Sequence, residues 1–265
     1  MDKRLTFNSD PGNYDRLRPT YSNKLFNDLL NYSRLDNKME ALEIGIGTGQ
    51  ATTPILETGC NITAIEIGNK LADFAREKFS NYINLNIINH DFEKVNLEEN
   101  KYDLIYSASA FHWIPLDAGL TKVMKLLKSG GVFAWFSVSP LPAMEHRHIN
   151  DKIQNIYGKY SEYFGNYEAK KDLERLNDEV DKKLASRVDA LVNYSFTDIQ
   201  NETYYCSRTF KAEDYATMIS TFSDHKAMPI EIRRKFLEEI VETINKYGGE
   251  FTLSDKMILC MGRKK

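Results

Sequence analysis

Leu42–Gln50 read LEIGIGTGQ, and this stretch decides the fold that the sequence predicts. Three glycines at alternate positions, Gly45, Gly47 and Gly49, follow an apolar run and open a helical pattern. Glycine has no Cβ and tolerates φ > 0, so it suits a strand-to-helix turn whose backbone approaches a ligand closely. A dinucleotide-binding loop reads G-x-G-x-x-G. Here the third glycine comes one residue earlier, and an acid, Glu43, lies two residues before the first glycine. The turn is therefore expected to hold a different ligand.

Apolar runs alternate with helical patterns around this turn, which predicts a parallel sheet covered by helices on both faces. Strands are expected at 41–45, 62–67, 83–87, 102–107 and 132–138. The run at 83–87 alternates with asparagine, as is typical of a strand at the edge of a sheet. Before the last of these strands, Pro115 suits the first turn of a helix, and Lys125 and Lys128 suit its last turn. Gly130-Gly131 is expected to end that helix.

The pattern changes after Pro140. Residues 144–198 carry no strand signal, and apolar residues recur at helical spacing from 173 to 188 within a highly charged segment. We expect a helical insertion that covers the ligand cleft. A strand at 203–210, helices near 211–221 and 229–247, and a strand at 251–261 are expected after it.

Four more motifs follow the glycine turn: Glu66 near the end of NITAIEI, His90-Asp91-Phe92, DLIYSASAFHW at 103–113 and KLLKSGGVFAWF at 125–136. With the E-x-G-x-G-x-G turn they resemble the class I S-adenosylmethionine (SAM)-dependent methyltransferases, with Ser129 where proline is usual. The resemblance implies an α/β fold: a Rossmann-like, mostly parallel sheet of seven strands with an antiparallel last strand. Helices on both faces and a helical insertion complete that fold.

The resemblance also implies roles for single residues. The glycine turn would lie against the methionine part of SAM, Glu66 would accept the ribose hydroxyls, and Asp91 would contact the adenine with Phe92 nearby. A solvated strand end is the alternative for Glu66, and a helix cap is the alternative for Asp91. The candidate cofactor-binding residues are Tyr14, Arg18, Glu43, Gly45, Gly47, Thr48, Gly49, Gln50, Glu66, Ile67, Asp91, Phe92, Ser107, Ala108 and Phe111.

The acceptor is expected beside residues 111–113, at the carboxyl edge where open α/β sheets bind ligands. His112 is the candidate catalytic base, because imidazole titrates near neutrality; a structural role is the alternative. The pattern Y-x-x-x-R-P-x-Y at 14–21 and the segment TFSDH at 221–225 resemble the type 11, trans-aconitate-methyltransferase-like small-molecule enzymes. By that resemblance, Arg18 pairs with the cofactor carboxylate. The candidate substrate residues are Tyr21, His112, Trp113, Ser223 and His225.

Composition limits the partners. A net charge of −3 and a pI near 6.0 argue against a nucleic-acid substrate. The three cysteines are far apart, which favours reduced thiols, and His146 and His148 lack further ligands at metal-binding spacing. With no apolar run of membrane-spanning length and no leader pattern, a cytoplasmic protein is expected. We expect a small-molecule acceptor, no metal, no membrane, and a monomer or homodimer.

Four parts are expected along the chain: an N-terminal lid and first helix at 1–38, the SAM-binding core at 39–139, a helical cap at 140–200, and the C-terminal part of the core at 201–265. The sequence thus predicts a SAM-dependent methyltransferase (EC 2.1.1) acting on a small molecule, with O- or carboxyl-methylation favoured. A non-catalytic SAM-binding regulatory protein is one alternative. An NAD(P)-dependent oxidoreductase is another, which the glycine spacing disfavours.

Overall fold

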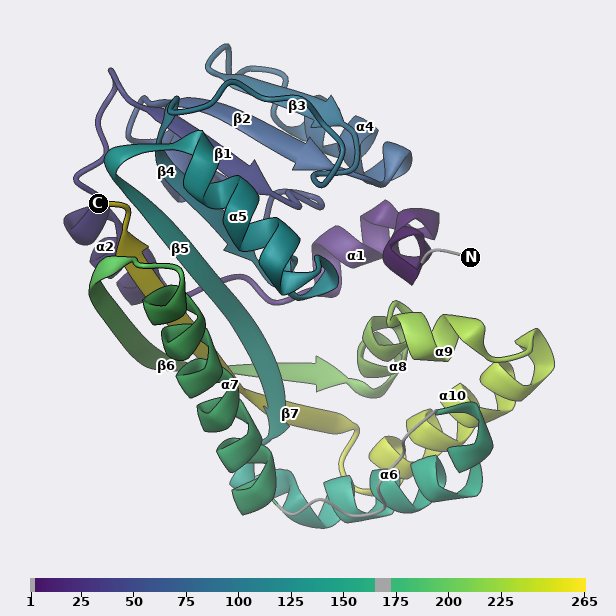
Figure 1. Cartoon of the computed structure of the whole chain (residues 1–265). Coiled ribbons are helices and arrows are strands. Elements are labelled where there is room, and N and C mark those ends of the chain that lie inside the picture. The colour runs from purple at the N-terminus through teal and green to yellow at the C-terminus, as the bar shows by residue number, and fades with distance from the viewer. Residues whose placement is uncertain (1–2, 165–172) are drawn as a thin grey trace. The chain divides into compact units, whose positions relative to one another are not determined.

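A computed structural model of the chain describes residues 3–164 and 173–265 (Figure 1). The part of the predicted helical insertion at 165–172 lies outside the described residues. The chain divides into two compact units. The first unit comprises Met1–Arg18, Ser139–Glu179 and Tyr205–Lys256. The second unit comprises Pro19–Val138, Val180–Tyr204 and Met257–Lys265, and it contains the whole glycine turn.

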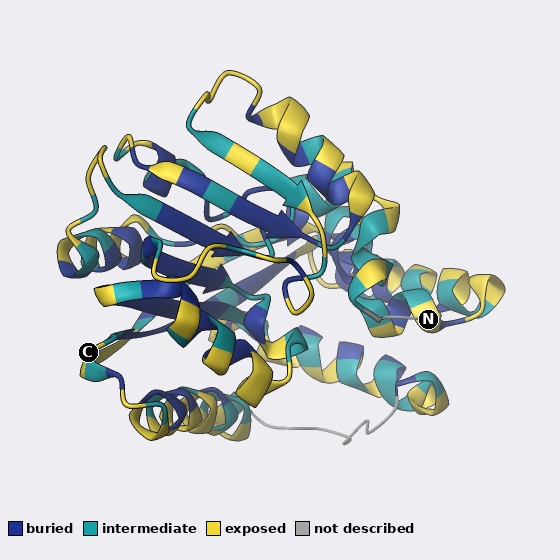
Figure 2. Cartoon of the chain, turned by 45° about the horizontal axis from the view of Figure 1, so that its top comes forward, coloured by how far each residue is buried: buried dark blue, intermediate teal, exposed yellow. Residues whose placement is uncertain are grey.

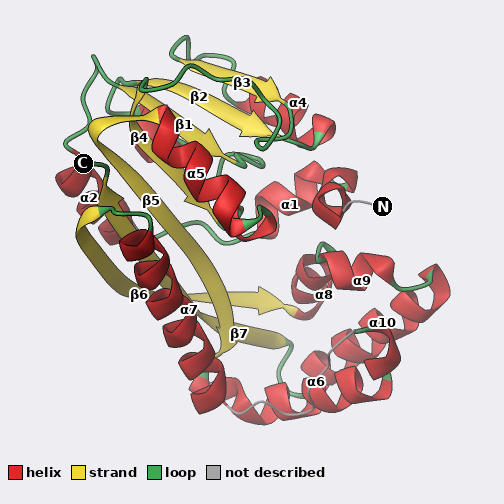
Figure 3. Ribbon diagram, in the orientation of Figure 1, coloured by secondary structure: helices red, strands yellow, loops and turns green. Residues whose placement is uncertain are grey.

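The predicted seven-stranded sheet is confirmed, with the strand order β3-β2-β1-β4-β5-β7-β6 (Figure 3). β1 pairs in parallel with β2 and β4, and parallel pairing continues to β3 on one side and to β5 on the other. β7 lies between β5 and β6 and runs against β5. The strands are β1 Glu40–Ile44, β2 Asn61–Glu66, β3 Leu85–Asn89, β4 Tyr102–Ala108, β5 Leu127–Pro142, β6 Thr197–Lys211 and β7 Glu250–Arg263.

Local sequence signals account for several helix ends. Asp10 caps α1 by accepting the N–H of Asn13, and Ser22 caps α2 by accepting the N–H of Leu25. The helical pattern that the glycines open forms only the short helix α3, because residues 49–52 form turns. The described helices are α1 Pro11–Leu17, α2 Asn23–Ser33, α3 Thr53–Leu56, α4 Asn69–Lys78, α5 Leu116–Leu126, α6 Arg147–Lys159, α7 Leu173–Asn193, α8 Ala212–Ser220, α9 Ser223–Ala227 and α10 Ile230–Lys246. The described residues also form four short 3-10 helices, η1 Lys3–Ser9, η2 Phe111–Trp113, η3 Met144–His146 and η4 Ser161–Tyr163.

The predicted boundary between the fourth strand's helix and the fifth strand was wrong. α5 ends at Leu126, so Lys128 and Gly130-Gly131 belong to β5 and do not end the helix. The reason is pairing with residues distant in sequence. The ammonium of Lys128 lies 2.7 Å from Oδ2 of Asp103 on β4, and the N–H of Gly130 bonds the carbonyl of Lys264 at 2.8 Å. Gly130 has φ 77°, which glycine adopts without strain.

The second unit has its own hydrophobic core between β1, β4, β5 and the helices α5 and α7. Leu42, Ile105, Phe133 and Leu191 are fully buried in it. Figure 2 shows the buried residues concentrated along the central strands. β3 alternates between exposed and half-buried residues at one edge of the sheet, as predicted from its asparagines. This core fixes the carboxyl ends of β1, β2 and β4, where the predicted site residues lie.

The first unit has a separate core. Apolar residues of α6, α8 and α10 enclose Phe236, Ile240 and Phe251, none of which is exposed. α9 was not expected from the sequence: the TFSDH segment contributes its last three residues to this short helix. Tyr14, Arg18, Ser223 and His225 belong to this unit.

Candidate active site

The glycine turn follows β1 at the carboxyl edge of the sheet. Gly45, Gly47 and Gly49 have φ of 77°, 59° and 85°, a backbone region that glycine adopts at no steric cost. A Cβ added to Gly45 would lie 2.4 Å from the Cβ of Ala110, and one added to Gly49 would lie 2.2 Å from the Phe79 ring. Both backbone conformation and packing therefore require glycine at the two ends of the turn.

Glu66 ends β2 beside this turn. Its side chain is 5% exposed, Oε2 accepts the N–H of Gly47 at 2.9 Å, and Oε1 accepts the N–H of Gly68 at 2.8 Å. Burial raises the pKa of this carboxyl, and backbone hydrogen bonds from Gly68, Gly47 and Ile67 oppose the shift. Each carboxylate oxygen has a second lone pair that is available for a ligand hydroxyl.

Glu43 lies on β1 just before the turn and is 1% exposed. Its Oε2 accepts hydrogen bonds from the hydroxyls of Thr52 and Tyr106, each at 2.8 Å. Across 3–164 and 173–265, no donor lies within hydrogen-bonding distance of Oε1. Burial raises the pKa of Glu43 to about 7, against the effect of the two hydroxyls. A buried acceptor without a donor is costly, and binding of a ligand donor would remove that cost.

Asp91 follows β3 and is half-buried. Its Oδ1 accepts the N–H of Glu93 at 3.0 Å, which is the geometry of a turn cap. Ile67, next to Glu66, is half-buried, and its carbonyl accepts from the amide of Asn89 at 3.1 Å. Phe92 is 5% exposed and belongs to the core of the second unit.

The predicted residues at the end of β4 and just after it differ in burial. Ser107 is fully buried and donates to the carbonyl of Ile44 at 2.9 Å, and Phe111 packs in the core with its ring centroid 5.0 Å from that of Trp135. Ala108 is half-buried. In the glycine turn, Thr48 is fully buried and its hydroxyl accepts from the amide of Gln50.

Three of the predicted substrate residues lie in the second unit. The hydroxyls of Tyr21 and Ser109 are 2.8 Å apart, which places Tyr21 at the end of β4. Ser109 was not a predicted site residue. Its backbone has a φ of 54°, which is unusual for a residue other than glycine. The rings of His112 and Trp113 lie 5.0 Å apart just beyond, in η2. The structure therefore brings Tyr21, His112 and Trp113 to one edge of the sheet.

The pKa of His112 is lowered to about 4. The main cause is loss of water around the imidazole, and the positive charges of Lys183 and Arg187 add to it. His112 is neutral at pH 7 and is a weaker base than free imidazole.

The remaining predicted residues form a group within the first unit. The guanidinium of Arg18 lies 4.9 Å from the ring centroid of Tyr14 and donates to the carbonyl of Thr221 at 3.3 Å. His225 is 2% exposed and lies 2.7 Å from both the hydroxyl of Tyr157 and the carboxylate of Asp224. Ser223 is the first residue of α9 and is half-buried.

Arg187 was missed from the sequence. It is 2% exposed, and it shares the buried face of α7 with Val180, Leu184 and Leu191. The spacing of four, three and four residues is a helical stripe, so the available signal was a charged residue at an apolar position. A buried charge of this kind is rare unless it is paired.

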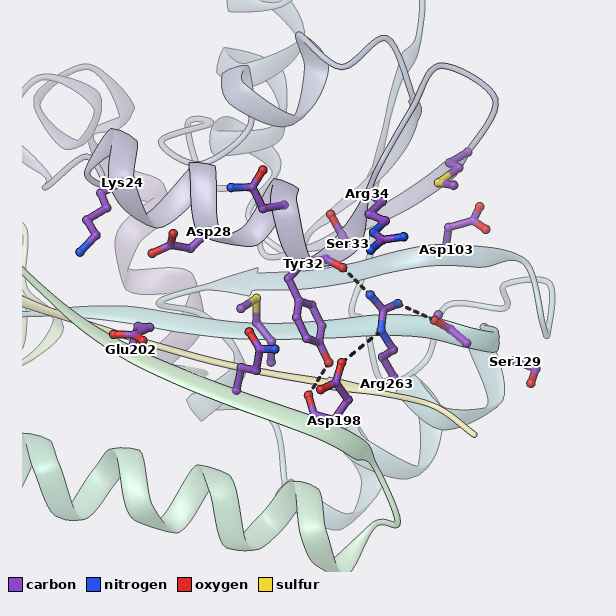
Figure 4. A pocket seen from close by; sticks show the side chains of 16 residues that line it. Lys24, Asp28, Tyr32, Ser33, Arg34, Asp103, Ser129, Asp198, Glu202 and Arg263 are labelled. Carbon is purple, nitrogen blue, oxygen red and sulfur yellow. Dashed lines mark hydrogen bonds and ion pairs between the residues drawn. The ribbon is translucent and has the colours of Figure 1, made fainter.

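A hollow of about 920 Å³ lies at the opposite, amino edge of the sheet (Figure 4). Met39, Asp103 and Gly130 line it near the beginnings of β1, β4 and β5, and Arg263 projects into it beside Asp198. Ligands of open α/β sheets bind at the carboxyl edge, so we assign the candidate active site to the glycine turn and not to this hollow.

Within the described residues, no group of three or more histidine, cysteine or acidic side chains gathers as a metal site would require. None of the helices described in 3–164 and 173–265 has the length and apolar character to cross a bilayer.

Known proteins resemble the chain in sequence and in fold. The methyltransferase domain family matches residues 42–135, from the glycine turn to Trp135. A probable S-adenosylmethionine-dependent methyltransferase of Saccharomyces cerevisiae is 28% identical over 76% of this chain and 68% of its own length. A malonyl-[acyl-carrier protein] O-methyltransferase of Ilyobacter polytropus is 30% identical over 64% of this chain and 61% of its own length.

Among solved structures, a putative type II methyltransferase from Anaeromyxobacter dehalogenans has the same fold. The TM-score is 0.61 at 18% identity, and the match covers 94% of this chain and 97% of that one. The family match includes the turn, Glu66 and the segment after β4, which are the elements gathered at the carboxyl edge. Residues 42–135 of the chain thus match the methyltransferase domain family, and together with the sequence relatives this match supports a class I S-adenosylmethionine-dependent methyltransferase.

Proposed function

We propose that the chain transfers a methyl group from SAM to a carboxylate or hydroxyl oxygen of a small molecule. The observation that carries the proposal is the contact between Glu66 and Gly47. It places an acid with free lone pairs against the glycine turn, where ribose hydroxyls and an amino-acid moiety would be bound together. The Ilyobacter relative, named for O-methylation of a malonyl group, supports an oxygen acceptor.

The described residues fit the cofactor. Glu43 offers Oε1, a buried acceptor with no donor in the described chain, to the α-ammonium of SAM. Glu66 would accept the ribose hydroxyls and Asp91 the adenine amino group. The full cofactor set proposed is Tyr14, Arg18, Glu43, Gly45, Gly47, Thr48, Gly49, Gln50, Glu66, Ile67, Asp91, Phe92, Ser107, Ala108 and Phe111. Tyr21, His112, Trp113, Ser223 and His225 are proposed for the acceptor.

The bound cofactor supplies a methyl group that is already activated on a sulfonium. The protein therefore has to hold the acceptor oxygen in line with that methyl group and exclude water, which contributes roughly 7–11 kcal/mol when the alignment is good. A hydroxyl acceptor needs a base, whereas a carboxylate does not. The lowered pKa of His112, about 4, makes it a weak base. We therefore favour a carboxylate acceptor, with His112 as a neutral neighbour of the reacting oxygen.

Two measurements test the proposal. In the first, calorimetry with S-adenosylhomocysteine and with NAD separates the cofactor classes: we expect binding of S-adenosylhomocysteine only. Binding of NAD alone would overturn the proposal. In the second, SAM with a labelled methyl group is incubated with panels of small carboxylic acids, phenols and amines. Labelled ester is the expected product, and cofactor binding without any labelled product would favour the non-catalytic alternative.

A further inference from the structure

Arg187 carries a buried charge that no carboxylate among the described residues neutralises. Its Nη2 donates to the hydroxyl of Ser137 at 2.8 Å, Nη1 donates to the carbonyl of Trp135 at 3.4 Å, and the guanidinium lies 4.5 Å from the Trp135 ring. No carboxylate pairs with Arg187 within 3–164 and 173–265, and its Nε has no hydrogen-bond partner there. At 2% exposure, Arg187 is shielded from bulk solvent.

Neighbouring titratable groups do not supply a counter-ion. Cys260 lies close to Arg187, but burial raises the pKa of this thiol to about 12 despite the nearby guanidinium. The thiol is therefore neutral at pH 7. The pKa of Arg187 falls to about 10, mainly through burial, so the guanidinium remains charged. An uncompensated buried charge is strongly destabilising, and such a cost is typical of a position kept for a ligand.

The location is the acceptor side of the candidate active site. Ala108, the last residue of β4, pairs with Phe136, so Ser137 lies one residue beyond the end of β4. The charge of Arg187 acts on His112 and on Tyr21, two of the proposed acceptor residues. All of these residues lie in the second unit, together with the glycine turn.

We infer that Arg187, with the hydroxyl of Ser137, binds an anionic group of the methyl acceptor. The anion is a carboxylate or a phosphate, because both match the planar fork of donors on a guanidinium. It is a group other than the oxygen that receives the methyl group, since a tight ion pair would make that oxygen less nucleophilic. Arg187 thus determines specificity by selecting acceptors that carry a fixed negative charge. This inference rests on the proposed function.

Both tryptophans, Trp113 and Trp135, lie at this site, so their fluorescence can report binding. We would titrate the protein, saturated with S-adenosylhomocysteine, with succinate, citrate, glycerol 3-phosphate and inorganic phosphate, and with dimethyl succinate as the neutral counterpart. At least one of the anions, and not the diester, should bind the wild type. In Arg187→Met the affinity for that anion should fall by about tenfold to a hundredfold, the usual worth of a hydrogen bond to a charged group. The affinity for S-adenosylhomocysteine should change less than twofold.

The stability of the unliganded protein separates a ligand-binding role from a structural one. Removing an unpaired buried charge should leave the melting temperature of Arg187→Met unchanged or higher, while stabilisation by the anion disappears. The control is Arg263→Met at the amino edge, where the arginine lies over Tyr32 and pairs with Asp198 at 3.7 Å. That variant should bind the anion like the wild type. If Arg187→Met does not fold, Arg187→Lys and Ser137→Ala are measured in its place, and each must lower the affinity for the same anion.

Two results would overturn the inference. One is equal anion affinity in the wild type and in the Arg187 and Ser137 variants. The other is binding of S-adenosylhomocysteine with no binding of any anion in the panel. Failure of S-adenosylhomocysteine itself to bind would instead count against the proposed function, so the two failures are distinguishable.

Discussion

The carboxylate of Glu66 accepts the backbone N–H of Gly47 at 2.9 Å and so joins the end of β2 to the turn after β1. The N–H of Gly68, at the start of α4, donates to the other oxygen at 2.8 Å. One side chain thus holds two backbone segments at the carboxyl edge of the sheet. In the proposed cofactor site it would serve two purposes: it positions the turn, and it would offer its remaining lone pairs to the ribose.

Glu66→Gln should therefore weaken cofactor binding and leave the chain folded. The amide keeps one acceptor oxygen but turns a donor toward one of the two backbone N–H groups. We expect the affinity for S-adenosylhomocysteine, measured by calorimetry, to fall at least about tenfold, as for a lost hydrogen bond to a charged group. Glu40→Gln, at the amino end of β1, is the matched control and should bind normally. Equal affinity in both variants would remove Glu66 from the proposed cofactor site.

Gly45→Ala should lower the free energy of unfolding by about 2–4 kcal/mol. The new Cβ would meet that of Ala110 at 2.4 Å, and an alanine at φ 77° is strained by about 1–2 kcal/mol in addition. Urea unfolding measures the change. Gly12→Ala in α1 is the control, because its Cβ would meet nothing within 4 Å and alanine favours helix. A Gly45→Ala variant as stable as the wild type would show that the packing against Ala110 relaxes at no cost.

The parts of the fold that local patterns encode were predictable, and those that depend on distant pairing were not. Gly45 to Gly49 and Glu66 come from one short strand–helix–strand segment, so their spacing alone indicated a shared site. Gly130 resembles a helix stop in sequence, but its conformation is set by pairing with Lys264. Likewise, Glu43 accepts hydrogen bonds from Thr52 and Tyr106, which are 9 and 63 residues away from it in sequence.

Arg187 shows a second reason why part of the site could not be predicted from the sequence. Its position on the apolar stripe of α7 was visible in the sequence, but a charged residue there is usually paired once the chain folds. Only the structure shows that Ser137 and Trp135 surround the guanidinium without a carboxylate among the described residues. The absence of a partner is a property of the packed site and leaves no trace in a single sequence.

Glu43 should make stability depend on pH between about 4.5 and 7. Its pKa is raised to about 7 from a normal value of 4.5, so the folded chain binds more protons than the unfolded chain over that range. The contribution of Glu43 is therefore fully present below pH 4.5 and is lost as the pH rises through 7, by about 3 kcal/mol in all. Glu43→Gln keeps an oxygen for Thr52 and Tyr106 and removes the titration. Both proteins are unfolded with urea from pH 5 to pH 8. As the pH rises, the wild type should lose stability relative to Glu43→Gln. If the two stabilities change in parallel with pH, the raised pKa is contradicted.

The same carboxyl should couple cofactor binding to pH. If Oε1 of Glu43 accepts from the α-ammonium of SAM, the ionised form binds more tightly, so affinity should rise as pH increases from 6 to 8. Calorimetry with S-adenosylhomocysteine measures this in the wild type and in Glu43→Gln. The variant should bind more weakly at pH 8 and lack the rise. If the affinity rises equally with pH in both proteins, a group other than Glu43 causes the pH dependence.

His112→Ala should lower turnover by less than about tenfold, because a residue acting as general base normally contributes a hundredfold or more. With a pKa of about 4, the imidazole is neutral throughout the pH range of an assay; loss of water around the ring is the main cause, and the charges of Lys183 and Arg187 add to it. A carboxylate acceptor needs no proton removed, so kcat should also show no ionisation of His112 between pH 5.5 and pH 8. His112→Gln retains hydrogen-bonding groups but cannot act as a base. Comparing it with His112→Ala therefore separates the loss of a hydrogen-bonding contact from the loss of a base. A large loss of kcat in both variants, with cofactor affinity preserved and an inflection near pH 6.5 in the wild type alone, would make His112 the base and the acceptor a hydroxyl.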